Sequence, residues 1–203
     1  MSTWIRTACI ECDLIVTVRA LEGGEQASCP RCHHVLTANV EDAQTKCLAL
    51  ALDASMLLVM SNVFPFMSLE ASGLEQVMTL PGSALQLYRD GFATIAVLVL
   101  GPIVGIPALI LGVAMALLIA LRQERGASWL VPAGRLLFFL NPWSMVEVFV
   151  IAVLVSLVKI GAMATVILGI SFWAYVAFAV CFTAMLVNLD RVQLWRAIEA
   201  RVA

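Results

Sequence analysis

The sequence predicts an all-α polytopic membrane protein with four transmembrane helices and a small N-terminal β zinc ribbon. Hydrophobic residues make up 62% of the 203 residues and charged residues 13%, whereas a soluble domain has about 25% charged residues. The mean hydropathy of +0.98 agrees with an integral membrane protein. Two Cys-x2-Cys pairs in a polar N-terminal segment predict the ribbon. No basic stripe accompanies the net charge of −2, so nucleic-acid binding is set aside.

The hydropathy pattern divides the chain into three parts. Residues 1–42 are polar and form the predicted cytoplasmic ribbon module, residues 43–190 form the membrane domain, and residues 191–203 form an amphipathic tail. Leu194, Trp195 and Ile198 lie on one side of the helix predicted for this tail. Because the N-terminal segment is polar and carries cysteines, we expect no signal peptide.

The predicted metal ligands are Cys9, Cys12, Cys29 and Cys32, in two pairs that sixteen residues separate. Four thiolates can close a tetrahedral shell around Zn²⁺ and leave no position open for catalysis. The spacer contains a β-prone run at residues 14–18 and a Gly-Gly turn at residues 23–24. So short a module cannot build much of a core, which favours a structural metal. Iron in the same four-sulfur shell stays open.

Other uses of these cysteines fit the sequence less well. Disulfides need an oxidising compartment, and a redox-active Cys-x2-Cys pair normally lies beside a βαβ pattern, which is missing here. His33 and His34 follow the second pair; a ligand exchange with one of them is conceivable, but the pattern favours solvated loop residues. Cys47 and Cys181 fall outside the pattern and receive no role.

The first two predicted spans cover residues 46–67 and 92–121, each at least the roughly 20 residues that cross a bilayer. The first contains Asp53 and Asn62, and Pro65 ends or kinks it. The second contains the sequence GPIVGIP, whose two prolines interrupt the helical hydrogen bonds. Either a kink or a discontinuous helix lining a cavity follows from this pattern.

The third and fourth predicted spans cover residues 143–164 and 170–188. Asn141 is the expected cap of the third span, with Pro142 in its first turn. This span contains Glu147, Ser156 and Lys159 in an otherwise apolar sequence. The fourth span contains Thr183.

The connections between the spans differ in charge. Residues 68–92 form an acidic loop with a turn at Pro81-Gly82, and residues 136–141 form an interfacial approach to the third span. The linker 122–135 is basic, and so is the tail. The positive-inside rule then predicts that both termini are cytoplasmic, which agrees with reduced cysteines.

Placing an ionisable side chain inside a membrane costs free energy, so the presence of each one calls for a structural or functional explanation. One interpretation is helix-to-helix packing, with Lys159 paired to Asp53 or bonded to Asn62 and with Glu147 reaching the interface. The other is a lipid or proton pathway. Its candidate residues are Asp53, Asn62, Glu147, Ser156, Lys159 and Thr183. Counted in residues from the start of each span, Asn62 and Lys159 are expected at similar depth in the membrane. The same count places Glu147 nearer the cytoplasmic surface than Asp53.

Several motifs together resemble one family. They are the four-cysteine ribbon, SNVFPF at the end of the first span, GPIVGIP in the second, NPWSMVEVF and LVSLVK in the third, and LDRVQLW after the fourth. This order resembles the paraquat-inducible protein A family, which includes intermembrane lipid transport proteins of the LetA type. The PWSM-x-E/D-VF segment and the ribbon are the most specific parts of the resemblance.

The resemblance implies a protein of the Gram-negative inner membrane that handles phospholipid together with a periplasm-spanning MCE-domain partner. It also implies that Cys9, Cys12, Cys29 and Cys32 bind the metal and that Glu147 and Lys159 are polar positions of the third span. Known members carry two ribbon-plus-four-helix units, whereas this chain carries one, so a second half-length chain or a dimer is expected.

No catalytic set stands out, and we expect no enzyme. The spans hold no haem-binding histidine pair and no Ser–His or Cys–His arrangement. A passive membrane anchor or assembly scaffold for the MCE partner is the first alternative function. A membrane stress or redox protein is the second.

Overall fold

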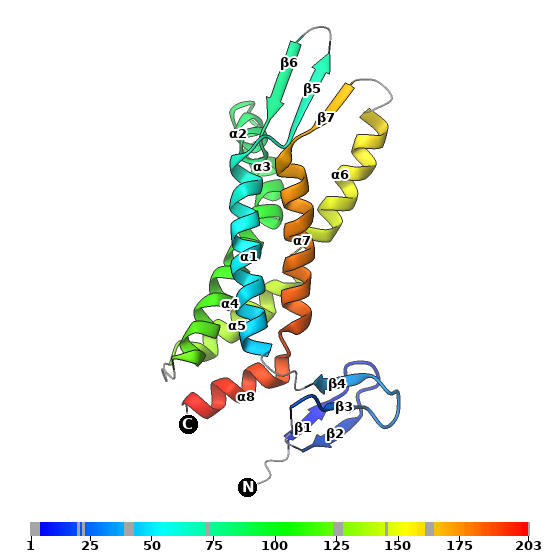
Figure 1. The fold of residues 1–203 in the computed structure, drawn as a ribbon, viewed down its shortest axis with the longest axis vertical. Helices are drawn as coiled ribbons and strands as arrows, with labels where there is room; N and C mark the ends of the chain where they lie inside the picture. The colour runs from blue at the N-terminus through cyan, green and yellow to red at the C-terminus, as the bar shows by residue number, and fades with distance from the viewer. Residues whose placement is uncertain are drawn as a thin grey trace.

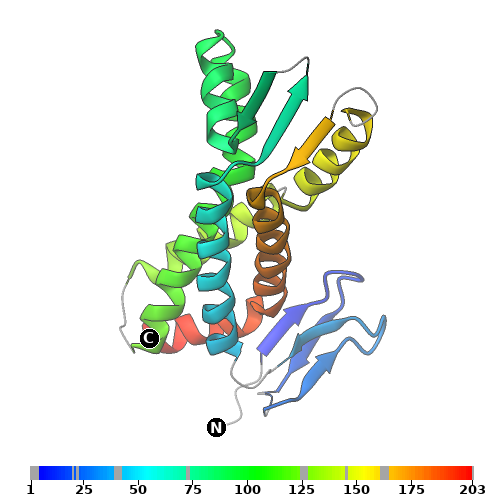
Figure 2. The same cartoon turned by 45° about the horizontal axis from the view of Figure 1, so that its top comes forward.

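In the computed structural model, a bundle of long helices carries a small β module at each end (Figure 1). The structure describes residues 5–19, 21, 23–38, 43–71, 74–123, 128–144, 146–160 and 165–202. The N-terminal strands and the C-terminal helix lie at one end of the bundle, here called the ribbon end. A three-stranded sheet lies at the opposite end, here called the sheet end, and Figure 2 shows the same separation from another side.

Four helical stretches are long and apolar enough to cross a membrane: Ala43–Val63, Ala93–Arg122, Leu130–Lys159 and Ile170–Asn188. The predicted fold class is therefore confirmed. Helix α1 (Ala43–Val63) ends two residues before Pro65, as expected from the missing proline N–H.

Helices α1 and α7 (Ile170–Asn188) make the most extensive helix–helix contact of the described structure. Ala51 and Ala54 of α1 are fully buried in the same cluster as Phe178 and Phe182 of α7. Small residues on one helix let the backbones approach closely, and the aromatic rings of the other fill the remaining space. This pair is the central support of the bundle.

The second span is one bent helical path made of α3 (Ala93–Leu100), a π-helical turn η1 (Gly101–Gly105) and α4 (Ile106–Arg122). The prolines of GPIVGIP therefore widen the helix without interrupting it, so the span is a continuous kinked helix, while Ile103 and Val104 of η1 also line a pocket. Pro107 has no N–H to donate to the carbonyl of Ile103, four residues earlier. The hydroxyl of Tyr175 on α7 donates to that carbonyl at 3.0 Å instead, so the bend is stabilised by a neighbouring helix.

The predicted start of the third span was wrong. Helix α5 (Leu130–Leu140) precedes a 3-10 turn η2 (Asn141–Trp143), and α6 (Val146–Ile160) follows it. The segment predicted as an interfacial approach is thus already helical. Asn141 lies in the turn between the two helices, where its carbonyl accepts from the N–H of Ser144 at 3.2 Å. Pro142 cannot continue α5 because it lacks the donor.

The three-stranded sheet was not predicted. Strands β5 (Met67–Ala71), β6 (Leu74–Met78) and β7 (Thr165–Leu168) are all antiparallel, in the order β6-β5-β7. Met67 was expected at the end of the first span, the remaining residues of β5 and β6 in the loop 68–92, and β7 between the third and fourth spans. No local signal relates β5 to β7, because almost half of the chain separates them. Pro81 and Gly82, predicted as a turn, instead begin helix α2 (Leu80–Arg89), which Thr79 caps through the N–H of Gly82 at 3.1 Å.

At the ribbon end, β1 (Ile5–Ala8) pairs with β2 (Ile15–Val18), and β3 (Gln26–Ser28) pairs with β4 (Val35–Ala38). The turn at residues 23–24 joins the two hairpins. Helix α8 (Arg191–Val202) runs across the end of the bundle beside these strands (Figure 1). It buries Leu194 and Ile198. Of the predicted connections, Glu124, Arg125 and residues 161–164 lie outside the described residues.

Candidate metal centre and membrane site

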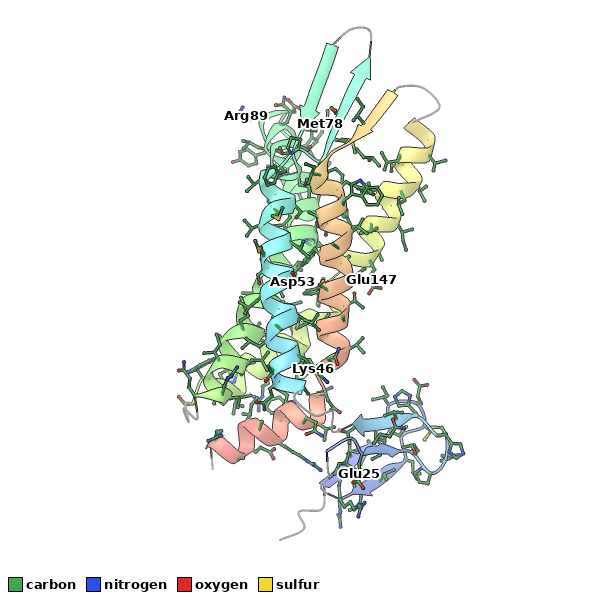
Figure 3. The ribbon with its side chains drawn as sticks, in the orientation of Figure 1. Glu25, Lys46, Asp53, Met78, Arg89 and Glu147 are labelled. Carbon is green, nitrogen blue, oxygen red and sulfur yellow. The ribbon has the colours of Figure 1, made fainter. Side chains whose placement is uncertain are left out.

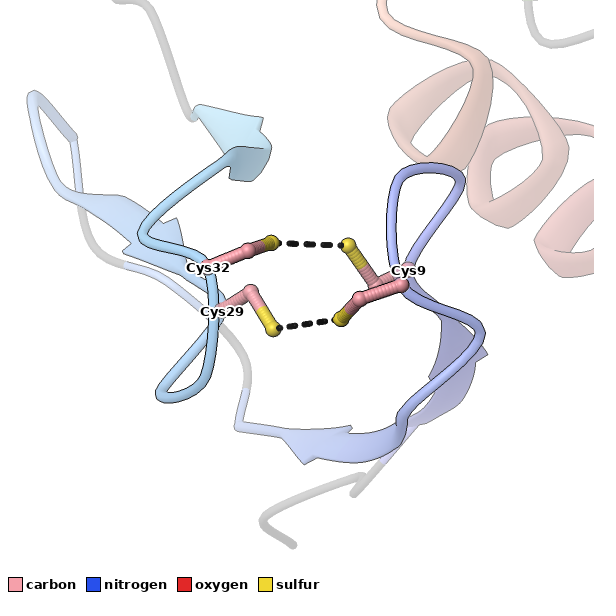
Figure 4. A group of neighbouring side chains, drawn as sticks. Cys9, Cys29 and Cys32 are labelled. Atoms are coloured by element: carbon pink, nitrogen blue, oxygen red, sulfur yellow. Dashed lines mark hydrogen bonds between the residues drawn. The ribbon is translucent and has the colours of Figure 1, made fainter.

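The four predicted ligand cysteines converge between the two hairpins of the ribbon (Figure 4). The sulfur atoms of Cys9 and Cys32 are 3.4 Å apart, and those of Cys12 and Cys29 are 3.6 Å apart. All four sulfurs lie within 4.8 Å of one another. A tetrahedron with metal–sulfur bonds of about 2.3 Å has sulfur–sulfur edges of roughly 3.8 Å. The cluster therefore fits a four-sulfur metal centre.

Each pair of cysteines sits in a turn of the same construction. The N–H of Cys9 donates to Leu14 O at 3.0 Å, and the N–H of Cys29 donates to His34 O at 2.8 Å. Asp13 and His33, each four residues after the first cysteine of its pair, have left-handed backbone angles of +55° and +59°. His33 thus serves the turn, and the described ligand group contains cysteines alone.

The thiols of the cluster titrate differently. Backbone N–H groups of Cys32 and Arg31 lower the pKa of Cys29 to about 6. At Cys32 the N–H of His34 acts in the same direction, but lost hydration and hydrogen bonds with the other three cysteines raise the pKa to about 12. One thiolate therefore forms readily, whereas further negative charge needs a cation to neutralise it.

The donor set supports a metal more strongly than a disulfide. Bonded sulfurs would lie about 2.05 Å apart, and all four cysteines are free thiols here. Zn²⁺ held by Cys9, Cys12, Cys29 and Cys32 would join the two hairpins and leave no open coordination position. The sulfur positions suit Zn²⁺ and iron alike.

Within the bundle, two carboxylates lie on either side of α7 at the same level (Figure 3). Asp53 of α1 accepts a hydrogen bond from the thiol of Cys181 at 3.1 Å. Glu147 of α6 accepts one from the hydroxyl of Thr183 at 2.8 Å. The predicted difference in depth between Glu147 and Asp53 is not seen within the bundle, because α5 forms the ribbon-end part of the third apolar stretch and α6 begins only at Val146.

A small polar cavity of about 150 Å³ adjoins Glu147. Asn141, Ser144 and Thr183 contribute polar side chains to its wall. The hydroxyl of Ser144 is buried and has no hydrogen-bond partner among the described residues, and a buried hydroxyl without a partner is unusual. The arrangement can hold a proton, a water molecule or a small polar group.

The other predicted polar residues lie apart from this cavity. Asn62 donates to Leu58 O on its own helix at 2.7 Å. Ser156 bonds in the same way to Ala152 O at 2.8 Å, and Lys159 is exposed in the last turn of α6. No ion pair joins Lys159 to Asp53 in the described part of the chain. Asn62 and Lys159 both precede strands of the sheet, so they share the sheet end.

Comparison with known proteins settles the family. The sequence model described as "Paraquat-inducible protein A" matches residues 44–199, which include the four spans, both carboxylates and most of α8. The chain belongs to the paraquat-inducible protein A family. The predicted resemblance is confirmed.

The relatives in this family carry transport names. The chain is 33% identical over 187 residues to "Intermembrane transport protein PqiA" of Escherichia coli. It is 26% identical over 191 residues to "Probable intermembrane transport protein" of Haemophilus influenzae. It is also 26% identical over 187 residues to "Lipophilic envelope-spanning tunnel protein A" of Escherichia coli.

These matches cover 92% or 93% of this chain but only 43% to 45% of each relative. The chain thus spans less than half the length of the curated relatives it matches. No solved structure matches the chain.

In this paraquat-inducible protein A family member, the sheet end also holds an apolar pocket of about 260 Å³ that the sequence analysis missed. Residues of α2, α3, η1 and α6 line it, with Phe66 and Met67 at the base of β5. Its lining residues are Phe66, Met67, Leu80, Ser83, Ala84, Leu87, Val99, Leu100, Ile103, Val104, Phe149 and Val153. Each segment that lines the pocket has the composition of an ordinary membrane helix or loop, so no sequence pattern predicted the pocket. The partners Cys181 and Ser144 were missed for the same reason.

Proposed function

We propose that this chain is an inner-membrane subunit of a Gram-negative intermembrane lipid transport system. The observation that carries the proposal is the apolar pocket at the sheet end. Its wall has one hydroxyl side chain, that of Ser83, among otherwise apolar residues. A polar ligand would find few hydrogen-bond partners in such a wall. A lipid acyl chain, in contrast, could enter it from the bilayer without exposing its apolar surface to water.

The relatives support the same function. Their names describe intermembrane transport and an envelope-spanning tunnel. We infer that an MCE-domain partner receives phospholipid at the sheet end, which would then face the periplasm. No side chain arrangement of the described structure suggests bond-making chemistry, so the proposed role is transport rather than catalysis.

We further propose that the ribbon end, and with it both termini, faces the cytoplasm. Lys46 lies at the ribbon end in Figure 3, and Arg122 and Arg191 end or begin helices there. The opposite sheet carries Glu70 and Glu75 as a cross-strand pair. This distribution agrees with the positive-inside rule.

A second four-helix unit is part of the proposal. Helix α6 presents Val148, Ile151 and Val155 outward, each at least 60% exposed. The relatives are more than twice as long as the matched region. We infer that a half-length paralogue or a second copy of this chain packs against this exposed face of α6.

Filling the pocket is expected to stop transport. Val153→Trp places an indole in the space that an acyl chain would occupy, and lipid transfer between vesicles should fall by about tenfold or more, equivalent to roughly 1.4 kcal/mol of lost binding. Purified protein with its partner and a fluorescent phospholipid gives the rate.

Val97→Trp is the matched control. Val97 is on α3, which also lines the pocket, but its side chain is 69% exposed and lies outside the pocket lining. We expect its transfer rate to stay near that of the wild type. Normal transfer by Val153→Trp, in protein that still binds its partner, would contradict the proposal and leave a passive anchor as the function.

The polar residues are expected to matter for turnover rather than for assembly. Glu147→Gln keeps the size of the side chain but removes the charge beside Thr183 and the small cavity. We expect complementation of a membrane-barrier defect to be lost at normal expression, because a charge retained in the membrane usually serves the transport pathway.

Lys159→Ala should show the same loss if a lipid headgroup contacts the end of α6. Full complementation by either variant would remove that residue from the pathway.

A further inference from the structure

A large groove separates the ribbon from α8 at the ribbon end. Its volume is about 860 Å³, and β1, β4 and α8 form its walls. The hydroxyl of Thr37 on β4 donates to the carboxylate of Asp190 at 2.6 Å, which joins the two walls at one edge. The groove thus has its two walls joined at one edge, and it lies beside the cysteine cluster, because Ala8, Ile10 and His34 also line it.

Positive charge predominates in this groove. Arg6 of β1 and Arg191 and Arg196 of α8 line it, together with the carboxylates Asp190 and Glu199. Asp190 is engaged by Thr37 and by the N–H of Val192, at 2.8 Å. It therefore acts as the cap of α8, which leaves the arginines as the groove's main recognition groups.

Two of the three guanidinium nitrogens of Arg196, a half-buried residue, have no partner within the described chain. Its Nε and Nη2 atoms are buried and have no hydrogen-bond partner among the described residues. Glu199 is one turn further along α8, yet no ion pair joins the two in the described structure. Buried guanidinium N–H groups normally find acceptors. Two parallel donors on one side of a guanidinium match a pair of oxygens on a phosphate or carboxylate.

The groove also lies where lipid headgroups would be. Helix α7, a membrane-spanning helix, ends at Asn188, and α8 begins only three residues later at Arg191. Trp195 lines the groove and stacks on Phe138 of α5 at 6.5 Å. Tryptophan is enriched at the membrane–water interface, and basic pockets on the cytoplasmic side of membrane helices are known to bind anionic headgroups.

We propose that this groove binds a phosphate group, held by Arg196 through two hydrogen bonds and by Arg6 and Arg191 through charge. Its position favours the headgroup of an anionic membrane lipid as the source, and free phosphate has the same chemistry. A lipid bound there would connect the ribbon to α8 and to the membrane surface. This site is separate from the apolar pocket and does not depend on transport.

The test uses the full-length, metal-loaded protein in bilayer nanodiscs. One set contains phosphatidylcholine alone, the second adds phosphatidylglycerol, and the third is phosphatidylcholine with inorganic phosphate in the buffer. Native mass spectrometry counts retained lipids, and thermal unfolding reports stabilisation. We expect retention of phosphatidylglycerol by the wild type, and about tenfold weaker retention by Arg196→Gln, as for a lost charge-assisted contact.

Arg122→Gln is the matched control, because it removes the same charge at the same end of the bundle but outside the groove. Arg196→Lys should lose part of the retention, since it keeps the charge but not the paired donors. If the Arg196 variants unfold or lose metal, Arg6→Gln on the opposite wall serves as the test variant, and we expect it to retain less phosphatidylglycerol than the wild type. Stabilisation by inorganic phosphate alone would assign the site to free phosphate. Equal retention by Arg196→Gln, Arg6→Gln and Arg122→Gln would overturn the proposal.

Discussion

Replacing Cys29 with serine is expected to release the metal and unfold the N-terminal ribbon while the membrane bundle stays folded. Cys29 is fully buried, and its thiol is the one with the pKa lowered to about 6. Because even outer-shell changes cost metal sites roughly 10- to 100-fold in affinity, loss of a ligand should exceed that. Metal analysis of purified protein and limited proteolysis within residues 1–42 measure the effect.

The ribbon has little besides the metal to hold it together. The described strands of the two hairpins contribute Val18 and Thr37 as buried side chains, beside Cys9 and Cys29. Structural Zn²⁺ contributes about 10–16 kcal/mol in small metal-binding modules, far more than such burial supplies. Acidification should release the metal as well, since protons compete for the thiolates.

Cys181→Ser is the control for this prediction. It removes a thiol of the same protein but not one from the cluster, and serine can still donate to Asp53. We expect unchanged metal content and unchanged proteolysis of the ribbon. A metal-loaded, protease-resistant Cys29→Ser protein would show that the four sulfurs do not form the metal shell.

Replacing Gly169 with alanine is expected to destabilise the bundle at the sheet end. A Cβ atom on Gly169 would lie 2.1 Å from the carbonyl oxygen of Pro65 and 2.9 Å from its carbonyl carbon. Both are backbone atoms, which cannot rotate away as a side chain can. Gly169 also donates its N–H to Phe66 O at 3.0 Å, so separating the two segments would break this hydrogen bond.

The affected junction joins the end of α1 and the start of β5 to the start of α7. Forced overpacking typically costs about 1–3 kcal/mol, and a backbone clash of this kind should reach or exceed the upper value. Thermal unfolding in detergent measures the loss. Gly112→Ala in α4 is the control, because its new Cβ meets no atom within 4 Å and alanine favours the helix. Equal stability of the two variants would contradict the close packing at residue 169.

The sequence by itself determined the parts that depend on local chemistry. Four long apolar stretches had to become membrane helices, because every backbone group in hydrocarbon needs an internal partner. The Cys-x2-Cys spacing determined the candidate metal ligands, since each pair lies within a single turn. Pro65 ended the first span for a local reason, the missing N–H.

The tertiary structure alone decided which distant segments meet. Strand β7 pairs with β5 almost a hundred residues away, and neither strand has an alternating pattern strong enough to reveal this. The carbonyl of Ile103, which Pro107 leaves without a backbone donor, accepts a hydrogen bond from the hydroxyl of Tyr175 on α7. Asp53 and Glu147 came to the same level because α5 fills part of the third span. Local sequence specifies donors, acceptors and breaks, but the partner of each is determined by the packing of helices far apart in the chain.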